Sequence, residues 1–169
     1  PEPVKTSVAS FVRNINEPLN SFNALLQGDP DQAAASFQRF IMNSTLGFLG
    51  FNDVASDFGI PYRREDFGQT LAHYGIGGGP YIVLPLLGPS NLRDTTGLAV
   101  DYFANPLTWG AENSDTAEAL YLGSVGLTAL HYRYATINQL NELQKSSIDY
   151  YAALRSLYRQ QRNKMIRNG

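Results

Sequence analysis

The stretch FGQTLAHYGIGGGPYIVLPLLGPSNLRD, residues 67–94, decides the fold of this chain. It contains six of the fifteen glycines and three of the nine prolines, and most of its other residues are aliphatic or aromatic. Glycine and proline at this density disfavour a regular helix, while apolar residues between them are atypical of a solvated loop. We therefore expect an irregular Gly/Pro-rich loop or short hairpin near residues 75–88, either packed in protein or lining a water-filled cavity.

Helical patterns flank this stretch on both sides. Asp29 followed by Pro30 is a strong helix start, because aspartate caps the N-terminus and proline fits the first helical position. Asn16-Glu17-Pro18 predicts an interruption, since a residue before proline is pushed out of the helical region. The apolar periodicity predicts about seven helices and one short helical turn, over residues 3–14, 18–28, 30–45, 53–58, 64–74, 90–103, 115–146 and 147–165.

The composition limits the class of protein. A chain of 169 residues is expected to form a single domain over residues 1–169, and the helical pattern predicts an all-α fold. Only 17% of the residues are charged, below the roughly 25% of soluble domains, which suggests that part of the surface does not face water. The net charge of −2 argues against a nucleic-acid partner. No run approaches the length of a membrane-spanning helix, whereas an interfacial location stays open.

Five cations lie in the last fifteen residues, which contain no aspartate or glutamate: Arg155, Arg159, Arg162, Lys164 and Arg167. Two roles are open for these cations. They can complement the dipole at the C-terminus of a helix, or they can face an anionic surface such as lipid headgroups or a partner.

The sequence gives little support for an enzyme, a cofactor or a metal. The run from Gly75 to Pro80 fails the dinucleotide fingerprint, because proline stands where a glycine is needed. His73 and His131 lack the spacing of a zinc protease and are expected to be structural. No serine lies in a nucleophile elbow. We therefore expect no catalytic residue, no metal ligand and no cofactor.

The pair Arg93-Asp94 follows the Gly/Pro-rich stretch directly. The two side chains can pin the base of the loop. Alternatively, the arginine can contact a lipid phosphate, since its guanidinium matches phosphate oxygens.

An aromatic stripe at helical spacing usually belongs to a core. Here the stripe continues into LGFLGF, residues 46–51, which is too apolar for an exposed loop. A lipid-facing role and a core role therefore both stay open. The candidates for a membrane interface are Phe37, Phe40, Ile41, Phe48, Leu49 and Phe51.

The run EPLNSFNALLQGDPDQAAASFQRFIMNSTLGFLGFNDVAS, residues 17–56, together with residues 67–94, resembles the MlaA (VacJ) family of Gram-negative outer-membrane lipoproteins. The similarity spans roughly residues 4–109, and elements such as Gln-Gly-Asp-Pro, Asn-Ser-Thr-Leu-Gly and Gly-Phe-Asn-Asp occur in family order. The stretch 146–162 is similar to the closing helix of the family more loosely, and residues 112–145 match it poorly.

The resemblance implies a compact, ring-like helical protein in the inner leaflet of the outer membrane, on its periplasmic side. Such proteins associate with trimeric porins. They remove phospholipid that has strayed into the outer leaflet, pass it through a central channel, and deliver it to the periplasmic carrier MlaC. The transfer uses no cofactor. The family begins with a lipidated cysteine and an extra helical segment, so we expect this chain to be an N-terminally truncated part of a lipid-anchored protein.

The resemblance and the glycine pattern together suggest that the loop lines or gates the lipid path. Replacing Gly78 with valine should then impair lipid removal and leave the protein folded. One alternative is a structural, porin-associated interaction protein without a lipid path. Another is a lipase, which would need a nucleophile hydrogen-bonded to His73 or His131. The residues assigned to the channel or gating loop are Gly75, Gly77, Gly78, Gly79, Pro80, Tyr81, Leu84 and Pro85.

Overall fold

The protein is described here by a computed structural model that covers residues 2–85, 87–105, 108 and 115–167. This part of the chain is mostly helical, with one two-stranded antiparallel sheet, which confirms the all-α fold and the short hairpin. Its elements are α1 (Glu2–Leu26), α2 (Pro30–Thr45), α3 (Val54–Asp57), α4 (Phe67–His73), β1 (Tyr81–Leu84), β2 (Gly88–Asn91), α5 (Leu92–Ala104), α7 (Asp115–Ser146) and α8 (Tyr150–Ile166).

The expected break at residues 16–18 is wrong, because α1 runs continuously through Pro18. The Asn16 side chain donates a hydrogen bond to the Val12 carbonyl at 2.7 Å, and so supports the backbone one turn before the proline. Glu17 is fully buried and paired with Arg39 of α2. These contacts outside the local sequence override the preference of a residue that precedes proline.

The start of α2 agrees with the sequence prediction. Asp29 accepts a hydrogen bond from the Gln32 N–H at 3.0 Å, and Pro30 occupies the first turn. Asp53 caps the short helix α3 in the same way, accepting from the Ser56 N–H at 3.3 Å.

The Gly/Pro-rich stretch forms an irregular segment followed by a hairpin. The strands β1 and β2 pair in antiparallel register, with Tyr81 opposite Asn91 and Leu84 opposite Gly88. Asn91 then caps α5 by accepting from the Asp94 N–H at 2.8 Å. The hairpin thus joins the loop directly to the first turn of α5.

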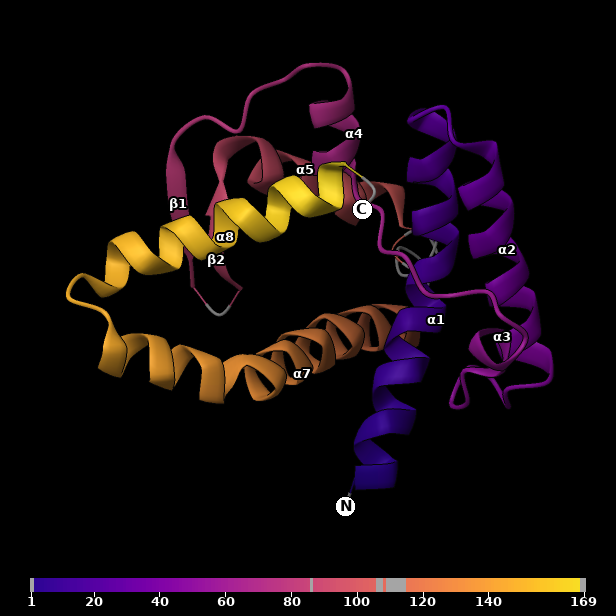
Figure 1. Ribbon diagram of the computed structural model, residues 1–169. Helices are drawn as coiled ribbons and strands as arrows, with labels where there is room; N and C mark the ends of the chain where they lie inside the picture. Colours follow the sequence, from indigo (N-terminus) through magenta and orange to yellow (C-terminus); the bar gives the residue numbers. More distant parts are fainter. Residues whose placement is uncertain (1, 86, 106–107, 109–114, 168–169) are drawn as a thin grey trace.

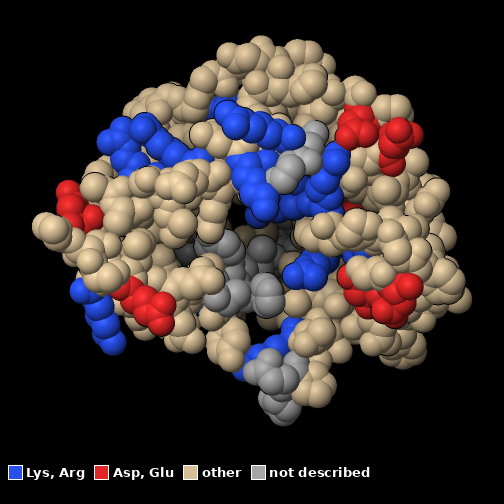
Figure 2. Space-filling view, viewed as in Figure 1, with Lys and Arg blue, Asp and Glu red and all other residues tan. Residues whose placement is uncertain are grey.

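The helices surround a central opening. Figure 1 shows α1 and α2 side by side, α4, α5 and the hairpin on the far side, and α7 and α8 joined at a turn. From that turn α8 runs back towards α4, so the C-terminal helix lies beside the middle of the chain. The space-filling view shows a hollow in the same face (Figure 2). This arrangement agrees with the ring that the resemblance implied.

Polarity in this fold is inverted relative to a water-soluble domain. Soluble proteins bury aliphatic and aromatic side chains and rarely bury charged ones fully. Here many large apolar side chains are exposed, and the buried apolar residues are mostly alanines. No helix within the described residues has the length and hydrophobicity needed to cross a bilayer. The largest fully buried side chains are Arg39, Gln69, Glu17, Glu65, Asn23 and Ser36.

Candidate functional site

An apolar surface covers the outside of α1, α2 and the turn after α2. On α2 the buried side chains are Ala33, Ser36, Arg39 and Asn43, whereas the aromatic stripe points outward. All the candidate interface residues except one are exposed; Phe40 is half-buried. The exposed fractions are 56% for Phe37, 46% for Ile41, 74% for Phe48, 65% for Leu49 and 37% for Phe51. Their contact with lipid stays a prediction.

The turn between α2 and α3 holds its apolar residues in an unusual backbone conformation. Phe48 and Leu49 have φ angles of 53° and 59°, which bulky residues rarely adopt. The Leu49 N–H donates to the Ser44 carbonyl at 3.1 Å, and the Gly50 N–H donates to the Asn43 carbonyl at 2.7 Å. Strained residues of this kind persist where the surrounding structure fixes them. The turn therefore presents two large apolar side chains to the outside in a defined geometry.

Beneath the apolar surface, the buried Arg39 connects α1, α2 and α3. Its Nε lies 2.5 Å from Glu17 Oε1, and its Nη2 lies 2.8 Å from Asp53 Oδ1. Its Nη1 also donates to the Ser56 hydroxyl and to the Ile60 carbonyl. Burial raises the pKa of Glu17, and hydrogen bonds from Arg39 and Asn20 oppose that rise. The pKa of Asp53 is lowered, because hydrogen bonds from Ser56 and Arg39 outweigh its burial.

A second ion cluster, in which only Glu65 is buried, lies where α1 meets the segment before α4. Arg63 bridges Asp29 and Glu65, with nitrogen–oxygen distances of 2.6 and 2.9 Å. Gln27 donates to the other Glu65 oxygen at 3.1 Å. Burial raises the pKa of Glu65 despite these partners.

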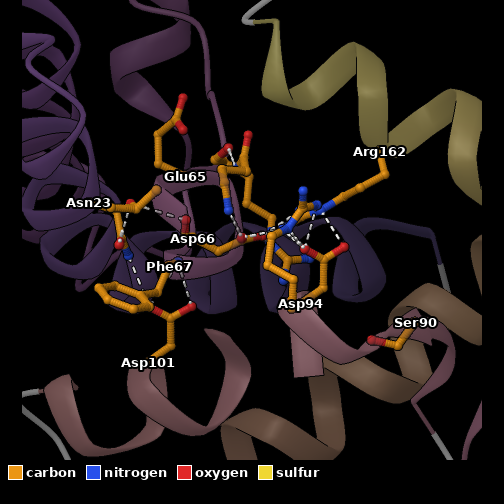
Figure 3. Close-up of polar contacts among 12 residues, drawn as sticks. Asn23, Glu65, Asp66, Phe67, Ser90, Asp94, Asp101 and Arg162 are labelled. Atoms are coloured by element: carbon orange, nitrogen blue, oxygen red, sulfur yellow. Dashed lines mark hydrogen bonds and ion pairs between the residues drawn. The ribbon is translucent and has the colours of Figure 1, made fainter. Parts of the chain in front are cut away.

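The third ion cluster attaches α8 to the middle of the chain. Arg162 reaches from α8 towards Asp66 and Asp94 (Figure 3), with distances of 2.7 and 2.5 Å to the two Asp66 oxygens and 2.8 Å from its Nε to Asp94 Oδ2. Arg93 contacts the same Asp94 at 2.8 Å. Burial alone would raise the pKa of both aspartates. The hydrogen bonds and charge of Arg162, joined at Asp94 by a Tyr158 hydrogen bond, outweigh it, so both pKa values are lowered.

Tyr158 strengthens the attachment of α8. Its hydroxyl donates to Asp94 at 2.5 Å and accepts from the Asn91 side chain at 3.0 Å. Burial and the nearby Asp94 raise the pKa of Tyr158, so the hydroxyl keeps its proton. The sequence analysis did not identify Tyr158, Asp66 or the pairing of Arg162. The spacing of Arg155, Arg159 and Arg162 at i, i+4 and i+7 was the available signal, since it places the three on one helix face.

The predicted loop residues lie close to the start of α5. The Arg93 N–H donates to the Gly78 carbonyl at 3.2 Å, and the Leu92 N–H donates to the Pro80 carbonyl at 3.1 Å. The Arg93 side chain donates to the Ile76 carbonyl at 3.3 Å. The base of the loop is thus tied to α5 by Arg93. Contact between Arg93 and a headgroup stays a prediction.

The remaining loop residues differ in their exposure. Gly75 and Gly77 are exposed, and a methyl group at either position would meet no other atom within 4 Å. A methyl group at Gly78 would lie 3.1 Å from the Asn91 side chain. Leu84 is half-buried and Pro85 is exposed at the end of β1. Their assignment to the channel or gating loop stays a prediction.

A polar pocket of about 350 Å³ lies between the glycine loop and α8. It is formed where the face of α8 carrying Arg159 and Arg162 meets the hairpin, and Figure 2 shows Lys and Arg side chains along the upper border of the central hollow. The pocket brings three predicted loop residues together with cations from the end of the chain. Its lining includes Gly78, Gly79, Tyr81, Arg93, Arg159 and Arg162.

A wider and more open hollow of about 540 Å³ lies beside α3. Asp53 and Ser56 in its lining already bond to Arg39, and Arg13 lies 5.3 Å from the centre of the Tyr62 ring. These polar groups already have interaction partners within the protein, so the pocket at α8 is the better candidate for a ligand.

Asp101 of α5 connects the α1–α2 side of the molecule to α4. Its carboxylate accepts from the Asn23 side chain at 3.0 Å and from the Phe67 N–H at 3.0 Å (Figure 3). Burial raises the pKa of Asp101 to about 6, and the nearby Asp66 adds to the rise.

His73 forms no cluster with a nucleophile in the described residues. His73 is exposed, and its ring lies edge-on to Tyr74 at 5.6 Å. The side chain of His131 lies outside the part that the structure describes. Among the described residues, no group of three or more histidine, cysteine or acidic side chains is placed to hold a metal ion.

The family model described as MlaA lipoprotein matches residues 1–165. The chain is 36% identical over 172 residues to the Escherichia coli protein named intermembrane phospholipid transport system lipoprotein MlaA, covering all of this chain and 65% of that protein. It is 40% identical over 154 residues to an uncharacterised protein of Rickettsia conorii, covering 90% of this chain and 59% of that protein. The chain thus spans about three fifths of the length of the curated relatives it matches.

A solved structure is similar along nearly the whole chain. It superposes with a TM-score of 0.82 and 30% sequence identity, covering 98% of this chain and 81% of the other. That structure is described as a structural basis for maintenance of bacterial outer membrane lipid asymmetry.

Proposed function

Because this chain belongs to the MlaA lipoprotein family, we propose that it is part of an outer-membrane lipoprotein that maintains lipid asymmetry. In this proposal the protein takes up phospholipid that has strayed into the outer leaflet. The lipid passes through the central hollow and leaves on the periplasmic side. No bond is made or broken, so the protein acts as a transporter.

The inverted polarity of the fold is the observation that carries this proposal. Exposed aromatic and aliphatic side chains on α1, α2 and the 46–51 turn surround an interior of buried charges. A water-soluble protein gains stability by the opposite arrangement. An apolar outer surface with a polar interior fits a protein that lies within one leaflet and offers a wet route to a headgroup.

Two properties of a phospholipid fit the arrangement around the hollow. Its headgroup needs polar surroundings, which the pocket beside Arg93 and Arg162 supplies. Its acyl chains need an apolar border, and the exposed Val83 and Leu92 lie on the neighbouring hairpin and α5. We assign the glycine loop to this passage, where it lines the path or gates it.

The proposal includes two protein partners. A trimeric porin would hold the ring in the outer membrane, in contact with part of the apolar surface. A soluble periplasmic carrier, MlaC, would receive the lipid. The whole protein would be held at the inner leaflet by a lipid anchor.

The test uses a Gram-negative strain that lacks its own MlaA-family protein and expresses the full-length protein containing this chain. A membrane-impermeant amine reagent labels phosphatidylethanolamine in the outer leaflet. We expect the unmodified protein to lower the labelled lipid to the level of the parent strain. Gly78→Val should restore it only in part, because the larger side chain presses against Asn91 and stiffens the loop.

Gly126→Ala in α7 is the matched control, since an added methyl group there meets nothing within 4 Å. It should restore the lipid level fully. Failure of the unmodified protein to lower the labelled lipid would refute the transport function. Full activity of Gly78→Val would refute only the role of the loop.

The second candidate is a structural, porin-associated protein without a lipid path. The exposed apolar surface also fits a protein partner, which favours this reading as the alternative. It predicts that the protein still co-purifies with a porin and that the labelled lipid does not change.

A further inference from the structure

Two arginines of α8, one in the lining of the polar pocket and one a turn earlier on the helix, have no carboxylate partner among the described residues. Arg155 and Arg159 form no ion pair within the described part of the chain, whereas Arg162 one turn further on contacts two aspartates. Arg159 lines the pocket. The Nε of Arg155 is buried and has no hydrogen-bond partner among the described groups. Buried polar groups are nearly always hydrogen-bonded, so an unpaired buried donor needs an explanation.

The charges around the pocket do not cancel. Arg93 and Arg162 are matched by Asp66 and Asp94, with which they form close contacts. This set of two cations and two anions is neutral. Arg159, with Arg155 one turn earlier on α8, therefore leaves the pocket with a positive surplus that an anionic ligand can neutralise.

Tyr81 adds a third unused donor. Its hydroxyl is buried without a hydrogen-bond partner in the described residues, and its ring lies edge-on to Tyr151 and Tyr158 at 5.4 and 5.9 Å. Burial and the neighbouring tyrosines raise the pKa of Tyr81, while the charge of Arg155 opposes that rise. The hydroxyl therefore keeps its proton.

An apolar border adjoins the pocket. Leu92 is 53% exposed and lies next to Gly79, which lines the pocket. Val83 and Leu87 are 53% and 41% exposed on the hairpin that begins at Tyr81. A ligand with one anionic group and long apolar chains would satisfy both surfaces, whereas an inorganic ion would leave the apolar border in water.

We propose that this pocket binds the phosphate diester of a phospholipid headgroup, with Arg159 as the principal ligand and Tyr81 and Arg155 as further donors. The proposal rests on the proposed function, in which phospholipid is the cargo, and it names the atoms that recognise it. A guanidinium matches two phosphate oxygens with parallel hydrogen bonds. A pocket of about 350 Å³ has room for a hydrated phosphate, since a water molecule occupies about 30 Å³ in the liquid.

Arg162 has a different part in this site. Its guanidinium is already held by four oxygens of Asp66 and Asp94, so it orients the pocket wall and fixes α8. Because Arg159 makes no such contacts, its removal should change ligand binding and leave the fold unchanged.

The test is a native mass spectrometry titration of the purified full-length protein in neutral detergent. The probes are dioleoyl-phosphatidylethanolamine, dioleoylglycerol with the same chains but no phosphate, and sodium phosphate. We expect the phospholipid to bind more tightly than either other probe. Arg159→Gln should weaken it by about tenfold, since it removes a charge-assisted contact, and Tyr81→Phe by about threefold, since it removes a neutral one.

Arg167→Gln is the matched control, because it removes a cation from the exposed C-terminal end of the same helix, away from the pocket lining. Its affinity should equal that of the unmodified protein. Thermal unfolding and circular dichroism of Arg159→Gln should also be unchanged, which separates a binding defect from misfolding.

Four outcomes would overturn the assignment. Equal affinities of Arg159→Gln and Arg167→Gln would exclude Arg159 as a ligand. Equal binding of dioleoylglycerol would show that phosphate is not recognised, and equal binding of sodium phosphate would identify an ion site. If the unmodified protein bound neither lipid, the proposed function would fail together with this site. If only Arg159 were excluded as a ligand, the protein would still bind phospholipid and the proposed function would stand.

Discussion

Two buried arginines, Arg39 and Arg162, each contact two carboxylates, yet they hold different kinds of structure together. Arg39 joins α1, α2 and α3, and its partners Glu17 and Asp53 lie 22 and 14 residues away in the sequence. Arg162 joins α8 to partners that lie 96 and 68 residues away, Asp66 and Asp94. The Arg39 cluster stabilises the compact group of α1, α2 and α3, whereas the Arg162 cluster closes the ring by fixing α8.

The surroundings of the two clusters differ as well. The Arg39 cluster lies between helices that pack along their length, and each of its charged groups contacts a group of opposite charge. The Arg162 cluster lies beside a pocket lined by Arg159, and within the described residues neither Arg159 nor Arg155 has a carboxylate partner. Similar ion pairs thus stabilise the fold where each charged group has an opposite partner, and are suited to ligand binding where neighbouring cations have none.

The largest effect should follow from Arg39→Met. The substitution leaves Glu17 and Asp53 without their cation, and removing one member of a buried ion pair costs about 3–5 kcal/mol of unfolding free energy. Urea unfolding in detergent, followed by circular dichroism, measures this loss. Gln38→Met is the control on an exposed position of the same helix, and it should change stability by less than about 0.5 kcal/mol. Similar stability of the two variants would contradict the structural role of Arg39.

Arg162→Met should have a smaller and more local effect. It releases α8 from α4 and α5, which should lower the free energy of opening that helix by about 3 kcal/mol. Hydrogen exchange followed by mass spectrometry should show faster exchange in α8 and unchanged exchange in α1 and α2. Uniformly faster exchange along the chain would mean that the two clusters form one cooperative unit, and the contrast between them would be lost.

Asp101 lies at the junction between the two regions, and of the three residues it should have the smallest effect on stability. Its pKa is about 6 in the folded protein and about 3.9 in an unfolded chain. Between about pH 3.9 and 6 the Asp101 carboxyl is protonated in the folded state and ionised in the unfolded chain. This group therefore stabilises the fold at low pH. Its contribution is lost as the pH rises through 6, and amounts to about 2–3 kcal/mol.

Asp101→Asn should remove this part of the pH dependence, measured as the difference between variant and unmodified protein from pH 4 to 7. Glu17 and Glu65 also have raised pKa values, but they contribute equally to both proteins and cancel in the difference. Asp57→Asn, at an exposed position, is the control. Parallel pH profiles for Asp101→Asn and the unmodified protein would refute the assignment.

Much of the fold could be predicted because the decisive signals are local. Asp29 and Pro30 start α2 through a cap and a fixed backbone angle, and both act within one turn. The glycines and prolines near residues 75–88 indicated a hairpin and an irregular loop for the same reason. The failure at Pro18 has the opposite cause, since the helix continues there through buried contacts with α2 that no local pattern reveals.

The direction of the aromatic stripe could not be predicted. A helical period shows that Phe37 and Ile41 share a face, but lipid and a protein core select the same residues on it. The neighbouring face settles the matter, because Arg39 and Asn43 find polar partners inside the protein. The apolar face is left on the outside.

The candidate site was only partly accessible from the sequence. The glycine loop and Arg93 were recognisable, and the absence of acidic residues after Arg155 indicated a cationic surface. Sequence alone does not reveal which cations are neutralised, since the partners of Arg162 lie on α5 and at the start of α4. Only the structure shows that Arg162 has carboxylate partners, whereas Arg159 has none within the described residues.

The turn at Phe48 and Leu49 has a consequence for contact with a bilayer. Its backbone is already fixed by hydrogen bonds to the end of α2, and Gly50 packs closely against the Asn14 side chain. Insertion into lipid therefore requires no further ordering of the chain, so the burial of both side chains counts almost fully towards affinity. In the proposed membrane position the turn would insert as a rigid unit, and loosening its backbone would weaken binding to lipid without changing an apolar side chain.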